Sequence, residues 1–200
     1  MPVEVAAAFP TEKSVGAAAA FAPRAATWEA ESVEMEEDVT AERNEPDALT
    51  DPATGLYTEN YLMVALDARI AAARRRLRPV ALALVEVGAD LAGGSPSAGD
   101  PVDVSEAIRS TIRAADTASR FGDGRYAIVL EDTPENGAIW TIERLRAALV
   151  SAHPNYTVWA GVACYPSHAF NVDEIMQQAS NALNQAREWR QDRIEVATSD

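Results

Sequence analysis

Apolar residues recur at helical spacing in four stretches of the chain, which predicts four amphipathic helices. These stretches are residues 57–76, 104–115, 134–149 and 172–189. Two further runs are apolar without interruption, Val80–Val87 and Tyr156–Cys164. Continuous apolar runs of this length are typical of strands that are buried on both faces of a sheet. The two runs are therefore expected to be central strands.

A hairpin is expected between the second and third helices. Residues 117–121 and 126–131 form two short strand-like segments around Gly122-Asp123-Gly124, a strong turn signal. Another short strand is expected at residues 193–197, and residues 88–101 form a loop rich in Gly, Ser, Pro and Ala. This order predicts a mixed five-stranded sheet covered by helices, an α/β or α+β domain.

Residues 1–48 differ in composition from the rest of the chain. They are rich in Ala and Glu and contain four prolines, and positions 1–50 hold 11 acidic and 3 basic residues. Such a segment buries too little apolar surface to offset the entropy lost on ordering it. We expect a disordered acidic tail at residues 1–48 and one folded domain at residues 49–200. The tail either keeps the protein soluble or docks on a partner.

Charge and cysteine content narrow the range of partners. The net charge of −14 argues against nucleic acid or an anionic membrane as a general partner, because both need a basic footprint. The single cysteine, Cys164, excludes a disulfide framework and favours a reducing cytoplasm. No run of 18 apolar residues occurs, so membrane insertion is not expected.

Six short motifs, taken in order along about residues 47–197, resemble the GGDEF (diguanylate cyclase) family. Their register matches the family at nearly the family's spacing, apart from a shortened loop between Val87 and Gly99. The motifs are Asp51-Pro52-Ala53-Thr54-Gly55-Leu56, Leu84-Val85-Glu86-Val87, Gly99-Asp100, Arg120 through Leu130, Ala160-Gly161-Val162-Ala163, and Ala182-Leu183 with Ala186-Arg187. The resemblance implies the nucleotidyl cyclase-like fold.

The signature of that family is altered here. A working member joins two GTP molecules, and carboxylates hold the metal ions that bind the triphosphate. The resemblance implies that Glu86 keeps one such acid, whereas Gly124 and Arg125 stand where two others belong. The remaining signature positions are Gly122, Asp123 and Tyr126.

The substrate loop departs from the family pattern as well. Residues 88–94 contain neither the phosphate-binding Lys nor the guanine-reading Asn of the family. Of the guanine-reading pair only Asp100 remains, and Arg187 replaces a phosphate-facing Lys. We therefore expect no cyclase activity, no metal and no cofactor. Arg125 would repel a divalent cation and is able to pair with Glu86 instead.

A second, non-catalytic site of the family binds the product, cyclic di-GMP, through Arg-x-x-Asp placed five residues before the signature. Arg113 and Asp116 have that spacing, and Arg144 matches a supporting Arg. Arg113 presents a planar fork that suits the O6 and N7 acceptors of guanine, and Asp116 is able to accept from N1 and N2. The motif is short, and the plain alternative is a surface ion pair.

Three functions remain open from the sequence. The first is an inactive domain that binds cyclic di-GMP and relays the signal to a protein partner or through a homodimer. The second is an interaction module that binds no nucleotide, and the third is a weak cyclase or GTP-binding regulator. The tryptophans Trp140, Trp159 and Trp189 are interpreted as packing groups.

Overall fold

The central strand is β1 (Val80–Ala89), and helices cover both of its faces. The computed structural model describes residues 49–89 and 97–198; the predicted tail and most of the substrate loop lie outside the described residues. Odd-numbered residues of β1, such as Val85, pack with α2 (Pro101–Thr111) and α3 (Glu135–Ala152). Even-numbered residues, such as Leu84, pack with α1 (Glu59–Arg76) and α4 (Val172–Arg187). Burial on both faces explains the unbroken apolar run.

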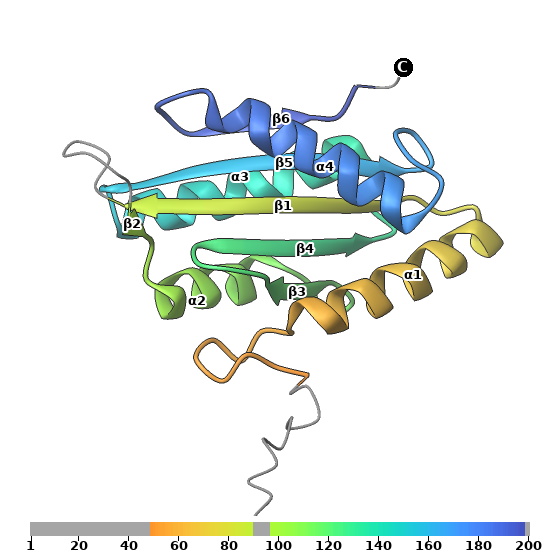
Figure 1. Cartoon of the computed structure of the whole chain (residues 1–200), viewed down its shortest axis with the longest axis horizontal. Coiled ribbons are helices and arrows are strands. Elements are labelled where there is room, and N and C mark those ends of the chain that lie inside the picture. The colour runs from red at the N-terminus through yellow and green to blue at the C-terminus, as the bar shows by residue number, and fades with distance from the viewer. Residues whose placement is uncertain (1–48, 90–96, 199–200) are drawn as a thin grey trace, which may run out of the picture. The chain divides into compact units, whose positions relative to one another are not determined.

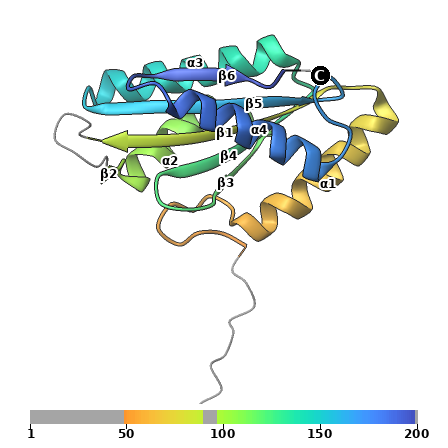
Figure 2. The ribbon, with the colours of Figure 1, turned by 45° about the horizontal axis from the view of Figure 1, so that its top comes forward.

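The strands form one mixed sheet in the order β3-β4-β1-β5-β6, with β2 paired to the end of β1. Only the β5–β6 pair is parallel among the described strands. The remaining strands are β2 (Ser97–Ala98), β3 (Thr117–Arg120), β4 (Arg125–Glu131), β5 (Tyr156–Tyr165) and β6 (Arg193–Val196). Figures 1 and 2 show α4 on one face of this sheet and α3 on the other.

Gly161 lets α4 lie directly against β5. A Cβ atom at this position would come within 2.2 Å of the Ala179 carbonyl oxygen and of the Leu183 amide nitrogen. Both of those atoms belong to the backbone of α4, so a side chain could not be accommodated without moving the helix. The position of Arg187, in the last turn of α4, follows from this close contact.

The fold class, the four helices and the five predicted strands are confirmed, with two differences in detail. The two-residue strand β2 was expected to be loop, because two residues are too few to show a period. The second helix was predicted at residues 104–115. It spans Pro101–Thr111 instead, so Arg113, which the predicted range placed inside the helix, lies beyond its end.

The packing role expected of Trp140 is also wrong, because its side chain is 69% exposed, whereas Trp159 is buried as expected. Trp189 is 47% exposed, so it packs only in part.

Candidate functional site

Glu86 lies between two arginine side chains near the end of β1. Its Oε2 accepts from Nε of Arg125 at 3.0 Å, and its Oε1 lies 3.2 Å from Nε of Arg187. The sheet register brings Arg125 of β4 directly opposite Glu86, and α4 supplies Arg187 from its last turn. The expected Glu86–Arg125 pair is therefore present, and Arg187, expected to face phosphate, joins it.

This cluster, Glu86 with Arg125 and Arg187, is cationic overall. Glu86 is only 16% exposed, and both of its carboxylate oxygens face a guanidinium. One carboxylate against two guanidinium groups leaves a net charge of +1. The retained acid is thus engaged in ion pairs rather than presented to a ligand.

The hairpin turn carries the other altered signature positions. Gly124 adopts φ +67°, and a Cβ atom there would lie 2.8 Å from the Val87 carbonyl oxygen. Gly122 also has positive φ, at +150°. Asp123 is 94% exposed and pairs with Arg120 at 3.3 Å, so its carboxylate points to solvent.

A divalent metal does not fit this donor set. Hard cations need several carboxylate or carbonyl oxygens, and the Glu86 oxygens already face two cations. Nowhere in the described part of the chain do three His, Cys, Asp or Glu side chains gather in a way that could hold a metal ion.

Asp100 and Tyr126 serve the fold. Asp100 is the N-cap of α2, and its Oδ1 accepts from the Val102 amide at 2.8 Å. Its own amide donates to the Tyr156 hydroxyl at 2.9 Å. The Tyr126 side chain is fully buried, and burial raises the pKa of its hydroxyl to about 12.

Arg113 and Asp116 form a turn beyond the end of α2. Asp116 Oδ2 accepts from the Arg113 amide at 2.8 Å, and its Oδ1 accepts from the Glu131 amide at 3.2 Å. The carboxylate thus ties this turn to β4, a role that the sequence did not indicate. The Arg113 side chain is exposed, and its guanidinium has no hydrogen bond or ion pair with any described residue.

Arg144 lies beside this turn. It projects from α3 and donates from Nη2 to the carbonyl oxygen of Thr111, two residues before Arg113. Its guanidinium carbon lies 5.6 Å from the ring centroid of Trp140, one helical turn earlier. The structure therefore brings the three sequence-predicted residues of the second site to one region, and the Trp140 ring lies beside Arg144 there.

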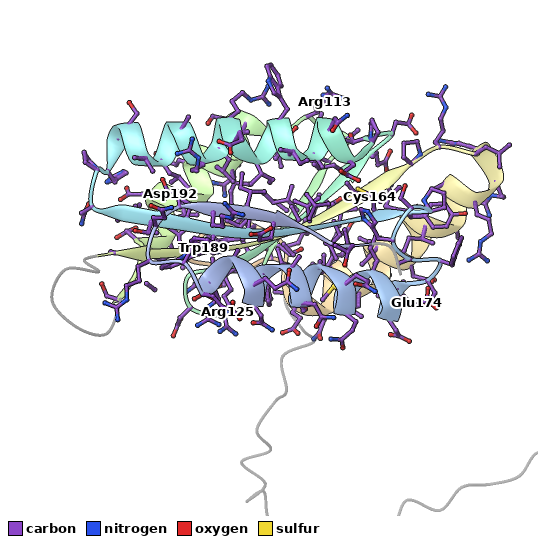
Figure 3. The ribbon with its side chains drawn as sticks, turned by 90° about the horizontal axis from the view of Figure 1, so that it is seen from above. Arg113, Arg125, Cys164, Glu174, Trp189 and Asp192 are labelled. Atoms are coloured by element: carbon purple, nitrogen blue, oxygen red, sulfur yellow. The ribbon has the colours of Figure 1, made fainter. Side chains whose placement is uncertain are left out.

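The two candidate sites lie on opposite sides of the sheet. Figure 3 shows Arg113 on the side of α3 and Arg125 on the side of α4.

A family model described as "Diguanylate cyclase, GGDEF domain" matches residues 48–193. The chain belongs to the GGDEF family. Among the described residues of this GGDEF domain, no helix is both long and apolar enough to cross a membrane.

Relatives of this GGDEF domain include diguanylate cyclase DgcP of Pseudomonas aeruginosa, 29% identical over 182 residues. These residues cover 82% of this chain and 27% of DgcP. The chain spans between 27% and 35% of the length of the curated relatives it matches.

Solved structures show the same fold. The GGDEF domain of YfiN (TpbB) from P. aeruginosa has a TM-score of 0.64 at 20% identity, covering 74% of this chain and 99% of that one. The GGDEF domain of DgcB from Caulobacter crescentus, in complex with c-di-GMP, has a TM-score of 0.62 at 22% identity. It covers 75% of this chain and 96% of that one.

Two further side chains were missed by the sequence reasoning. The His168 side chain is only 4% exposed, and its Nδ1 accepts from the Cys164 amide at 3.0 Å. Arg120 pairs with Asp51 at 3.3 Å and so joins the hairpin to the chain before α1. The Arg120–Asp51 pair joins residues 69 positions apart and so depends on the tertiary fold. The His168–Cys164 contact is local and closes the turn that follows β5.

Proposed function

We propose that this GGDEF domain is catalytically inactive and acts as a cyclic di-GMP receptor that passes the signal to a protein partner in the cytoplasm. The ligand binds at Arg113, Asp116 and Arg144. The observation that carries the proposal is a difference between the arginines at the former active site and Arg113 at the second site. Both oxygens of Glu86 face arginines, whereas the Arg113 guanidinium is exposed and unengaged within the described part of the chain.

The chemistry of the proposed site suits a guanine dinucleotide. Arg144 is held by the Thr111 carbonyl, so that part of its ordering cost is already met before binding. Cyclic di-GMP is a dianion, and two arginines supply local positive charge on a protein of net charge −14. The complex of the DgcB domain with c-di-GMP shows that another member of the family binds this ligand.

Asp116 has a double task in this proposal. Its carboxylate holds the turn through two backbone amides, which fixes the position of the Arg113 backbone. Each carboxylate oxygen has a second lone pair, so the group is still able to accept from a guanine. Asp116→Asn is expected to weaken binding and to relax the preference for guanine over adenine dinucleotides.

Calorimetric titration of the purified chain tests the proposal, with cyclic di-GMP as ligand and GTP as control. A bidentate Arg–guanine pair discriminates by about 1–3 kcal/mol, so Arg113→Ala should weaken binding roughly 5- to 150-fold. Arg144→Ala should also weaken it. Arg125→Ala, on the other side of the sheet, is the matched control and should leave the affinity nearly unchanged.

Absence of binding by the wild-type chain at high micromolar cyclic di-GMP contradicts the receptor proposal, as does full binding by Arg113→Ala. In either case the second function, an interaction module that binds no nucleotide, takes its place.

A further inference from the structure

Trp140 is exposed on a helix whose other face is well buried. Helix α3 packs Ile142, Leu145 and Leu149 against the sheet, while the Trp140 side chain is 69% exposed. Tryptophan is the largest apolar side chain, and leaving it in water forgoes most of the stabilisation it gains on burial. Its place on the solvent side of α3 therefore contributes little to the packing of this domain.

The Trp140 ring lies beside an arginine that two contacts hold in place. The Arg144 guanidinium carbon lies 5.6 Å from the ring centroid, within the range of a cation–π contact. The same guanidinium donates to the Thr111 carbonyl oxygen at the end of α2. Two contacts to different helices thus fix one planar cation beside one aromatic ring.

Arg113 completes the group. It follows Thr111 by two residues, and its exposed guanidinium forms no hydrogen bond or ion pair within residues 49–89 and 97–198. The end of α2, two residues before Arg113, is therefore joined through Arg144 to Trp140 on α3.

We propose that Trp140 is a binding residue of this site and stacks on a guanine base of bound cyclic di-GMP. The inference rests on the proposed function and adds to it a residue with a distinct task. Arg113 reads the edge of a guanine, Arg144 binds phosphate, and Trp140 covers the face of a base. Stacking on an aromatic ring accounts for a large share of single-stranded nucleotide binding, because every base has a π face.

Titration with cyclic di-GMP separates this role from a structural one. Loss of a base–aromatic stack predicts an affinity roughly 5- to 150-fold lower for Trp140→Ala. Trp140→Phe keeps an aromatic face and should retain most of the affinity. Because the side chain is exposed, both variants should melt at nearly the wild-type temperature.

Trp189→Ala is the matched control. Trp189 is 47% exposed and has the Arg193 guanidinium carbon 4.8 Å from its ring centroid, so the type of contact is the same. It lies after α4, on the other side of the sheet from Arg113, as Figure 3 shows. This variant should bind like the wild type.

Tryptophan fluorescence gives a second readout. Cyclic di-GMP should quench the emission of the wild type and of Trp189→Ala, and the quench should be largely lost in Trp140→Phe. Wild-type affinity in Trp140→Ala together with lost binding in Arg113→Ala overturns the role of Trp140 and leaves the receptor proposal standing. An equal loss in Trp140→Ala and Trp189→Ala also overturns it, and no binding by the wild type overturns both proposals.

Discussion

Tyr126 and Tyr156 are both buried but differ in what their hydroxyl groups meet. The Tyr126 hydroxyl has no hydrogen-bond partner among the described residues. The Tyr156 hydroxyl accepts from the Asp100 amide at 2.9 Å and lies 3.1 Å from Asp103 Oδ2. A buried hydroxyl without a partner carries an uncompensated desolvation cost of about 1–3 kcal/mol.

Removing each hydroxyl should therefore have opposite effects on stability. Tyr126→Phe is expected to raise the free energy of unfolding by up to about 2 kcal/mol, because it deletes an unpaired polar group. Tyr156→Phe is expected to lower it by about 1 kcal/mol, because it leaves the Asp100 amide without its acceptor. Urea unfolding followed by circular dichroism measures both. A lower stability of Tyr126→Phe would show that its hydroxyl has a partner in solution.

Asp51 supplies the pH dependence at the residue scale. Burial opposes its ionisation, but hydrogen bonds from the Thr54 amide and hydroxyl, with the charge of Arg120, outweigh burial and hold the pKa of Asp51 below its usual value. A carboxyl with a lowered pKa stabilises the fold above its unfolded-state pKa, which is about 4. That contribution is lost as the pH falls through the folded-state pKa.

Asp51→Ala should be less stable than the wild type at pH 7 by about 1–3 kcal/mol, because several donors lose their acceptor. The difference in the free energy of unfolding should shrink when the same measurement is made below about pH 4. Arg113→Ala, whose guanidinium has no described ion pair, serves as a control without such a trend. A difference in the free energy of unfolding that does not change with pH would contradict the assignment of this stabilisation to the ionised Asp51 carboxylate.

At the scale of elements, the sequence identified the helices and strands but not all of their ends. The apolar run of β1 was recognisable because both of its faces are buried, which leaves no polar position to interrupt it. The end of α2 was not recognisable. The helix ends at Thr111, and the Arg113 amide donates instead to the Asp116 carboxylate, which also accepts from the Glu131 amide. The contact with Glu131 is tertiary, so helical periodicity through Ala115 does not indicate it.

The contact between β5 and α4 offers a direct test of packing. Gly161→Ala would place a Cβ atom 2.2 Å from two backbone atoms of α4, so the helix must shift. Overpacking of this kind costs about 1–3 kcal/mol or more. Gly137→Ala on α3 is the control, since its Cβ would meet only side-chain atoms, the Thr133 methyl at 3.0 Å and the Pro134 ring at 3.5 Å, and alanine favours a helix. Thermal unfolding compares the two, and equal melting temperatures would contradict the close β5–α4 contact.

At the scale of the whole molecule, the candidate sites were predictable in part. Glu86 and Arg125 were expected to pair because the family resemblance places both at former metal-ligand positions, and the sheet register sets them opposite each other. Arg187 joins the pair only because α4 packs against β5, which a linear pattern does not show. Trp140 was interpreted as a packing group, and only the three-dimensional fold shows that it faces solvent. Ligand binding and partner choice stay predictions.

Catalysis is the property for which the whole assembly matters most, because a working cyclase of this family needs two domains that each present a metal-bound GTP. Here the Glu86 carboxylate faces Arg125 and Arg187, and Gly124 offers no side chain. The chain should therefore make no cyclic di-GMP from GTP and magnesium. Replacing Gly124 by Asp and Arg125 by Glu together should not restore synthesis.

Three reasons support the expectation that the double variant at positions 124 and 125 makes no cyclic di-GMP. Arg187 still forms an ion pair with Glu86. A residue with a side chain at position 124 has to adopt a backbone φ of +67°, with its Cβ close to the Val87 carbonyl oxygen. Residues 88–94 contain no Lys or Asn. Chromatography of the reaction mixture against an active cyclase and a reaction without protein is the measurement. Steady product formation by the wild-type chain would refute inactivity. Product formed only by the double variant would show that the two missing acids are the sole defect and that the substrate loop of this chain is competent.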